Sequence, residues 1–181
     1  FDARRDLRLI LPEPSGHLPP VDMQWRIAPL NRGINQPHLV DWDRDGVTDL
    51  AVSYPGSYSP SGPLWVCRGP LAEKHEFTMK RVECLPKNEV VDLSIEDLDN
   101  DRNFDLIFAR SRYDKAAKLQ RYGIEWLRNT TTSGEPIFAD AQPLIQVPRP
   151  WRLVAFSLVD WDVDDRTDVV ICVSKGSRKE G

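Results

Sequence analysis

An acidic motif that occurs three times constrains this chain more than any other feature. In each copy, aspartates alternate with other residues over nine positions, and an apolar run follows, at residues 41–49, 97–105 and 160–168. The leading aspartates Asp41 and Asp97 are 56 residues apart, and Asp97 and Asp160 are 63 residues apart. Recurrence of one pattern in a single register indicates a repeat architecture in which each repeat is one supersecondary unit.

Short apolar segments follow one order around each acidic loop. One segment precedes the loop, a second follows it, and a third and a fourth come after a stretch rich in turn residues. The predicted strands are 37–40, 50–54, 63–68 and 77–82 in the first repeat, 106–109, 123–128 and 144–147 in the second, and 153–159 and 169–173 in the third. Four short strands punctuated by Gly and Pro predict an antiparallel propeller blade, and the apolar strands beside the loops suit positions covered on both faces. We therefore expect an all-β fold, a partial β-propeller, with a short turn at 114–120 as the one helix-like segment.

The repeats divide the chain into four segments. Residues 1–36 are expected to form an extended arm and, at 23–27, the outer strand of a preceding blade. The following segments are a blade with the first loop (37–86), a blade with the second loop (87–148) and the first half of a blade with the third loop (149–181). Propellers close with roughly four to eight blades. About two and a half blades leave apolar faces open, so we expect further blades of a longer chain, or another subunit, to cover them.

Alternating aspartates in a tight turn bring several carboxylate oxygens to one point, and such crowding favours a bound cation. Oxygen-only ligation selects a hard ion, and six or seven ligands favour calcium over magnesium. The first, third, fifth and ninth residues are expected to donate side-chain oxygens, and the seventh its backbone carbonyl. The predicted ligands are Asp41, Asp43, Asp45, Val47 and Asp49; Asp97, Asp99, Asp101, Asn103 and Asp105; and Asp160, Asp162, Asp164, Arg166 and Asp168.

Two other interpretations of the loops compete with a metal site. Aspartates are common in polar turns without a metal, but three copies in register make that interpretation weak. A helix-loop-helix calcium site requires a glutamate at the twelfth position, which is absent, and helical flanks, whereas these flanks are strand-like. The sixth residue needs a positive φ, which suits Gly46 better than Asp165, and Asp165 better than Arg102. The first site is therefore expected to bind calcium most strongly, then the third, then the second.

The charge and hydropathy of the chain limit the kinds of partner and setting that it suits. The net charge is −4, from 28 acidic and 24 basic side chains, which disfavours nucleic acid as the main partner. No apolar run is long enough for a membrane-spanning helix, and the first residues show no signal peptide, so the sequence reads as a mature or excised segment. A basic group is predicted to be a solvated helical or looped insertion, with an acidic partner as the alternative: Arg110, Arg112, Lys115, Lys118 and Arg121.

Single residues outside the loops also carry expectations. A disulfide between Cys67 and Cys84 is conceivable in a secreted protein, and Cys172 is predicted to be a buried apolar residue. Trp42 and Trp161 are expected to pack at the blade surface. Residues 54–60, which contain two tyrosines, two prolines and one glycine, are expected to form either a long exposed turn or a contact loop.

The motif Asp-x-Asp-x-Asp-Gly-x-x-Asp-Leu between two apolar strands resembles the FG-GAP and VCBS repeats of integrin α-like propellers and bacterial secreted proteins. Residues 123–130 are similar to the third-strand segment of the VCBS type, and the resemblance covers about residues 37–174. It implies a seven- or eight-bladed propeller with calcium on the loops between first and second strands. It also implies an extracytoplasmic setting, secreted, periplasmic or on the cell surface, where millimolar calcium fills weak sites. Asn129-Thr130-Thr131 is a glycosylation sequon.

These observations favour a non-catalytic, calcium-stiffened scaffold, or a module that binds protein or glycan. The alternative is the propeller portion of a secreted enzyme, such as a polysaccharide lyase or a redox protein, whose active site lies outside this segment. No catalytic residue is assigned, because His17, His38 and His75 do not cluster with a Ser or Cys nucleophile in the sequence.

Overall fold

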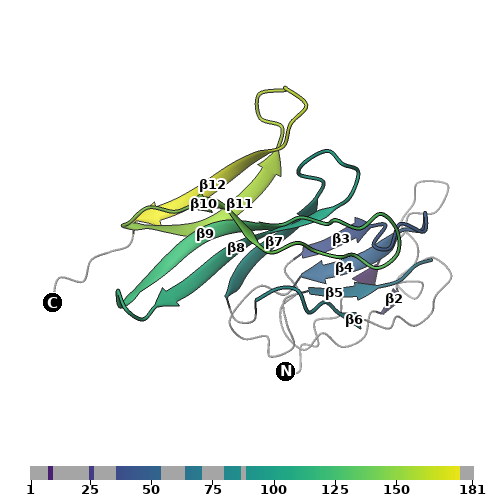
Figure 1. The fold of residues 1–181 in the computed structure, drawn as a ribbon, viewed down its shortest axis with the longest axis horizontal. Coiled ribbons are helices and arrows are strands. Elements are labelled where there is room, and N and C mark those ends of the chain that lie inside the picture. Colours follow the sequence, from purple (N-terminus) through teal and green to yellow (C-terminus); the bar gives the residue numbers. More distant parts are fainter. Residues whose placement is uncertain are drawn as a thin grey trace.

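The structure is a computed structural model, which describes residues 8–9, 25–26, 36–53, 64–70, 80–86 and 89–175. Within these residues every regular element is a β-strand and every strand pairing is antiparallel (Figure 1). The expected all-β fold is therefore confirmed. The described part of the chain has no helix of the length and apolarity needed to span a bilayer.

The first repeat forms a four-stranded sheet. Its strands are β3 (Gln36–Val40), β4 (Asp49–Ser53), β5 (Leu64–Cys67) and β6 (Lys80–Arg81), and they pair in chain order. Two short strands, β1 (Arg8–Leu9) and β2 (Trp25–Arg26), form a separate pair. The outer strand expected at 23–27 coincides with β2, and its pairing partner is β1.

The second repeat forms a longer four-stranded sheet, and the third repeat a two-stranded one. The second sheet contains β7 (Val90–Glu96), β8 (Asp105–Asp114), β9 (Leu119–Leu127) and β10 (Gln142–Gln146), and the third contains β11 (Trp151–Val159) and β12 (Asp168–Lys175). The basic residues predicted to form a helical or looped insertion lie instead on an extended hairpin. Strands β8 and β9 pair without interruption from Leu106↔Leu127 to Asp114↔Leu119, and only residues 115–118 form the turn.

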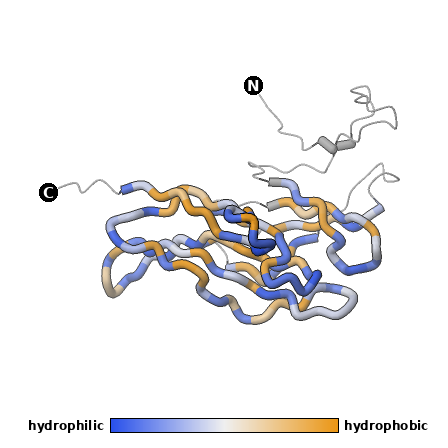
Figure 2. Tube along the Cα trace, turned by 90° about the horizontal axis from the view of Figure 1, so that it is seen from above, coloured by the Kyte–Doolittle hydropathy of each residue, from blue (hydrophilic) through white to orange (hydrophobic). Residues whose placement is uncertain are grey.

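Apolar side chains join the three sheets face to face. One core cluster includes Ala51 and Leu64 of the first sheet together with Leu93 and Phe108 of the second. A second cluster joins Ile107 to the third sheet through residues such as Phe156. Strand β8 is buried on both of its faces, since Phe108 and Ile107 are each 0% exposed. Hydrophobic stretches run along much of the tube, and hydrophilic stretches mark many of its bends (Figure 2).

The position two residues after each closing aspartate shows how the sheets follow one another. Ala51 packs toward the second sheet and Ile107 toward the third, but Val170 at the same position is 40% exposed. Cys172, predicted to be buried, is exposed on the same face of β12. The prediction, made from the apolar run 169–173, was wrong because in the described chain no further sheet packs on this face of β11 and β12.

The disulfide considered between Cys67 and Cys84 is not formed. Cys67 is buried at the end of β5, and its Sγ lies 3.8 Å from the carbonyl oxygen of Arg68. Cys84 is an exposed residue that is not in a disulfide, and desolvation of its thiol raises the pKa of that thiol to about 11. Cys84 is therefore a poor nucleophile at neutral pH.

Candidate metal centres

The three acidic loops share one hydrogen-bond pattern. The two carboxylate oxygens of the first aspartate accept hydrogen bonds from the backbone N–H groups of the fifth and sixth residues. Their N–O distances run from 2.7 to 3.1 Å for Asp41, Asp97 and Asp160. The aspartate at the fifth loop position accepts a hydrogen bond from the backbone N–H of the seventh residue. The N–O distance is 2.8 to 3.0 Å for Asp45, Asp101 and Asp164. Three sequences that differ at most other positions thus close the same turn.

Two positions of each loop have a left-handed backbone. The sixth residue has φ 84° at Gly46, 68° at Arg102 and 63° at Asp165, which confirms the expected positive φ. The fourth residue has one as well, with φ 62° at Arg44, 58° at Asn100 and 61° at Val163. That second position was not predicted, because none of its residues is glycine. A β-branched valine in this region is strained, so the loop geometry overrides local preference there.

The aspartate at the ninth loop position connects its loop to the rest of the sheet. Asp49 Oδ2 accepts from Trp42 N at 2.9 Å, and its Oδ1 accepts from Gly69 N at 2.6 Å. Asp105 makes the same pair of bonds, to Leu98 N at 3.2 Å and Asn129 N at 2.7 Å. These aspartates are 2% and 0% exposed, and burial raises the pKa of Asp105. They therefore hold the end of the third strand against the loop. This is a structural role, and the same carboxylates could also serve as metal ligands.

Three carboxylates converge in each loop, but the loop positions that supply them differ between the loops. Oxygens within 4.8 Å of one another come from Asp41, Asp43 and Asp45; from Asp97, Asp99 and Asp105; and from Asp160, Asp162 and Asp168. The predicted ligands Asp49, Asp101 and Asp164 stand outside these groups. The predicted ligand role of Val47, Asn103 and Arg166 rested on their carbonyls, and their N–H groups are held by the fifth aspartate.

Two buried oxygens of the loops have no hydrogen-bond donor among the described residues. They are Asp43 Oδ1 in the first loop and Asn103 Oδ1 in the second, and Asn103 is only 9% exposed. Burying an acceptor without a partner costs free energy. An oxygen-seeking cation in the loop is one way to satisfy both atoms.

An arginine from the end of the third strand reaches into each of the first two loops. Arg68 Nη1 lies 3.1 Å from Asp43 Oδ2 and 2.9 Å from Asp49 Oδ2. Arg128 Nε lies 2.6 Å from Asp99 Oδ2, and its Nη2 lies 3.2 Å from Asp101 Oδ2. Sequence reasoning missed both residues, although each follows the third strand directly.

These arginines change the electrostatics of the loops. Burial works against the charge of Arg68, yet its hydrogen bonds to Glu135 and Asp49 raise its pKa. Burial also works against ionisation of Asp101, but its bonds to Asn103 and Arg128 lower its pKa. The third loop differs, since in the described residues its nearest arginine contact is the exposed pair Arg166–Asp164 at 3.9 Å. The chain thus supplies part of the counter-charge in the first two loops itself.

The segment between β9 and β10 lies over the first loop. Gly134 N donates to Asp43 O at 3.0 Å, and Arg44 Nη1 donates to the carbonyl oxygens of Thr131 and Thr132 at 3.3 and 3.2 Å. Glu135 forms an ion pair with Arg68 Nη2 at 2.8 Å. The second and third loops touch through Asn100 Nδ2 and the carbonyl oxygen of Asp165, at 3.4 Å. The first two loops therefore each contact the next repeat.

The tryptophans at the second loop position have contrasting surroundings. Trp42 is 3% exposed and stacks on Phe104 of the second loop, with ring centroids 4.8 Å apart. The prediction that it lies at the blade surface was wrong, because it is buried between two repeats. Trp161 is 75% exposed, consistent with the absence of a following repeat against it in the described chain.

Other predicted features contribute less. Asn129, in the sequon, is 1% exposed and its Oδ1 accepts from Thr131 N at 3.0 Å, so a glycosyltransferase could not reach it in the folded chain. His38 lies on β3, and burial lowers its pKa. His17, His75 and the contact loop considered at 54–60 lie outside the described residues.

Comparison with models of known protein families finds no match, and neither does comparison with curated proteins or with solved structures.

Proposed function

We propose that this chain is a calcium-binding segment of a β-propeller of the FG-GAP and VCBS type, which acts as a non-catalytic scaffold or interaction module. The observation that carries the proposal is the identical turn made by three acidic loops, each of which brings three carboxylates together. Isolated acidic turns are common without a metal. Three copies that keep one geometry, including strained left-handed residues, point to a shared ligand.

The residues present fit a calcium ion. The donor set consists of carboxylate, amide and carbonyl oxygens, which hard divalent cations prefer. The unpartnered Asp43 Oδ1 and Asn103 Oδ1 are buried acceptors that such an ion would satisfy. In the first loop Asp41, Asp43 and Asp45 would hold it, with Val47 and Asp49 completing the site. Bound calcium would supply positive charge and hold the loop rigid, while the aspartates anchor the turn.

The open face of the third sheet supports the partial propeller. Val154 is 59% exposed on β11, and Val170 and Trp161 are exposed at positions that the preceding repeats bury. A further repeat stacked as the second stacks on the first would cover all three residues. We therefore take the remaining blades, from a longer chain or another subunit, to lie beyond β12. An extracytoplasmic setting fits loops of modest affinity, because calcium is millimolar there.

The proposal is tested by removing the third-position carboxylate from each loop. The triple variant Asp43→Asn, Asp99→Asn, Asp162→Asn keeps the size of each side chain and removes one charge per site. We expect wild-type chain to melt at a higher temperature in calcium than in EDTA, and the variant to lose that rise. Asp140→Asn, an exposed aspartate outside the loops, is the charge control and should keep the rise. If the triple variant retains the full calcium response, the loops are not the calcium sites.

A further inference from the structure

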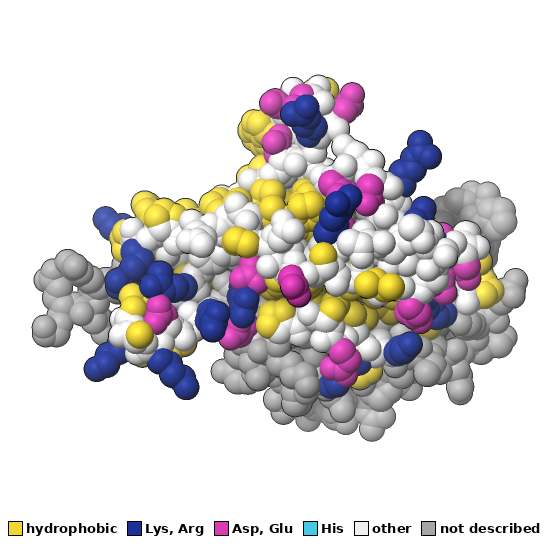
Figure 3. All heavy atoms as spheres, in the orientation of Figure 1, with side chains coloured by type: hydrophobic (Ala, Val, Ile, Leu, Met, Phe, Trp, Pro, Cys, Tyr) yellow, Lys and Arg dark blue, Asp and Glu magenta, His cyan; other side chains and the backbone are white. Residues whose placement is uncertain are grey.

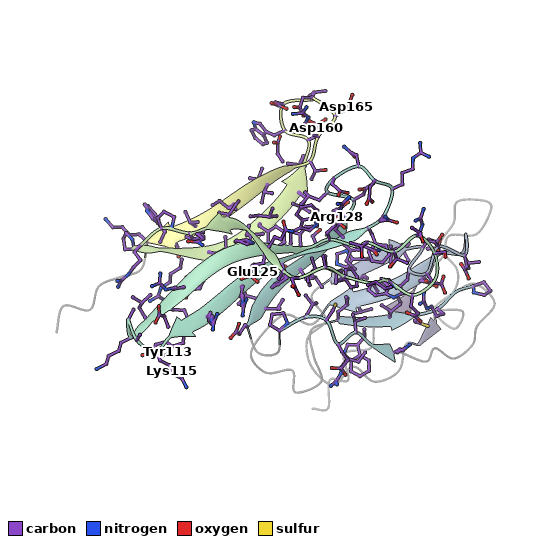
Figure 4. The ribbon with its side chains drawn as sticks, viewed as in Figure 1. Tyr113, Lys115, Glu125, Arg128, Asp160 and Asp165 are labelled. Carbon is purple, nitrogen blue, oxygen red and sulfur yellow. The ribbon has the colours of Figure 1, made fainter. Side chains whose placement is uncertain are left out.

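Opposite charges lie at opposite ends of the strands in the second and third repeats. Strand β8 leaves the second acidic loop at Asp105 and ends at the β8–β9 turn, and β11 runs the other way into the third loop. Tyr113 and Lys115 lie at that turn. The loop that holds Asp160 and Asp165 lies at the opposite end of the strands (Figure 4). Lys and Arg side chains gather around the turn end (Figure 3). The exposed basic residues there are Arg112, Lys115, Lys118, Arg121, Arg149, Arg152 and Lys175.

A groove opens within this basic end. It has a volume of about 300 Å³ and is lined by the β8–β9 hairpin, by β10 and by the residues that lead into β11. Its lining includes Arg112, Arg121, Arg149, Tyr122 and Trp151. Trp151 is 41% exposed, so part of its indole ring is open to solvent in the groove that these three arginines also line.

The arginines of the groove differ in how far their charge is already balanced. Arg110, which also lines the groove, pairs with Glu89 at 2.5 Å and with Glu125 at 2.8 Å, and Arg121 pairs with Asp114 at 2.7 Å. In the described part of the chain neither Arg112 nor Arg149 has a carboxylate within ion-pair distance. These two guanidiniums are the available anion-binding groups.

We propose that this basic groove binds an acidic polysaccharide through its carboxylate or sulfate groups. Planar guanidinium forks match these anions in bidentate geometry. The exposed face of Trp151 offers a flat apolar surface on which the C–H face of a sugar ring can stack. Ligand sites commonly combine such an aromatic surface with a few placed polar groups. A long nucleic acid fits less well, because the chain has a pI of about 5.4 and its acidic loops would repel strands that extend past the groove.

This site goes beyond the proposed calcium role and does not rest on it. The groove lies at the turn end of the strands, and none of its lining residues belongs to an acidic loop. Binding to the groove should therefore persist in EDTA as long as the chain remains folded. A failure of calcium binding leaves this proposal standing, and the reverse also holds.

The test uses the full chain and four probes: polygalacturonate oligosaccharides for carboxylate, heparin oligosaccharides for sulfate, neutral dextran and a short DNA duplex. We expect binding to one or both anionic glycans, weakened by salt, and none to dextran. The double variant Arg112→Gln, Arg149→Gln should weaken that binding by about tenfold or more. Trp151→Ala should weaken it with an unchanged salt dependence.

Two controls separate the groove from general charge effects. The double variant Lys80→Gln, Arg102→Gln removes two exposed cations elsewhere, and should bind like wild type. Thermal melting verifies that each variant is folded. The proposal is overturned if folded wild-type chain binds neither anionic glycan, if both double variants weaken binding equally, or if DNA binds more tightly than either glycan.

Discussion

Replacing Arg68 with methionine probes how the first acidic loop balances its charge. The guanidinium lies 3.1 Å from Asp43 and 2.9 Å from Asp49, so it occupies oxygens that the proposed ion would share. Methionine keeps much of the side-chain length and removes the charge. We expect the variant to bind calcium more tightly at the first site and to be less stable without calcium.

The size of the effect follows from these distances. With calcium–oxygen bonds of about 2.4 Å, a bound ion would lie roughly 5 Å from the guanidinium. Charges of +1 and +2 at roughly that separation repel by about 1.5 kcal/mol in water, which corresponds to roughly a tenfold change in affinity. Without calcium, loss of a charged hydrogen bond to Asp49, which is 2% exposed, should lower the free energy of unfolding by about 1–2 kcal/mol.

Calorimetric calcium titration and urea unfolding in EDTA measure the two effects. Arg81→Met is the matched control, because Arg81 has the same 30% side-chain exposure as Arg68 and pairs with Glu83 outside the loops. We expect little change in that variant. Weaker calcium binding in Arg68→Met would show that the guanidinium supports the site rather than competing with the ion. An equal gain in calcium affinity in both variants would show that the effect comes from the change in net charge alone.

Three further changes test other parts of the account. Gly69→Ala should cost about 1–3 kcal/mol of unfolding free energy, because its Cβ would meet Thr48 O at 2.5 Å; an unchanged urea midpoint contradicts this. Burial alone would raise the pKa of Glu135, but the hydrogen bond and charge of Arg68 lower it. The stability from this depressed pKa is present above the ordinary value of 4.5 and is lost as pH falls through the folded-state pKa. Glu135→Gln should therefore flatten the acid limb of a stability–pH curve in EDTA, and an equally steep limb would count against the pair. Val163→Gly should raise the free energy of unfolding by about 0.5–1 kcal/mol, because it relieves a valine with a left-handed backbone. Val170→Gly in β12 should lower the free energy of unfolding. Thermal melts that rank the two variants the other way would refute backbone strain at Val163.

The repeat pattern predicted most of the strands because it reflects local chemistry. The apolar runs that follow the first two acidic loops predicted strands at 50–54 and 106–109, and β4 and β8 begin one residue earlier, at the closing aspartates Asp49 and Asp105. The positive φ of Gly46 was also predictable, since glycine marks it. At Arg44 and Val163 the residue type gives no such signal, and the hydrogen bonds of the leading aspartate impose the conformation.

Features that depend on contacts between repeats were not predictable in the same way. Arg68 and Arg128 reach the acidic loops because the third strand of each repeat ends beside the acidic loop of the same repeat. The order of residues in the sequence does not reveal this proximity. The contact of Gly134 with Asp43 joins residues 91 positions apart. Cys172 was assigned to the interior from its apolar neighbours, but burial of an edge sheet depends on whether another sheet packs against its open face.

The most direct test of the account is a calorimetric titration of the wild-type chain with calcium after EDTA treatment and dialysis, with a folded state verified by circular dichroism. If the acidic loops are calcium sites, the chain binds two or three ions saturably, and its melting temperature rises with calcium concentration. A folded chain that binds no calcium at millimolar concentration would contradict this prediction, and the three acidic loops would then be turns held by their own aspartates and by Arg68 and Arg128.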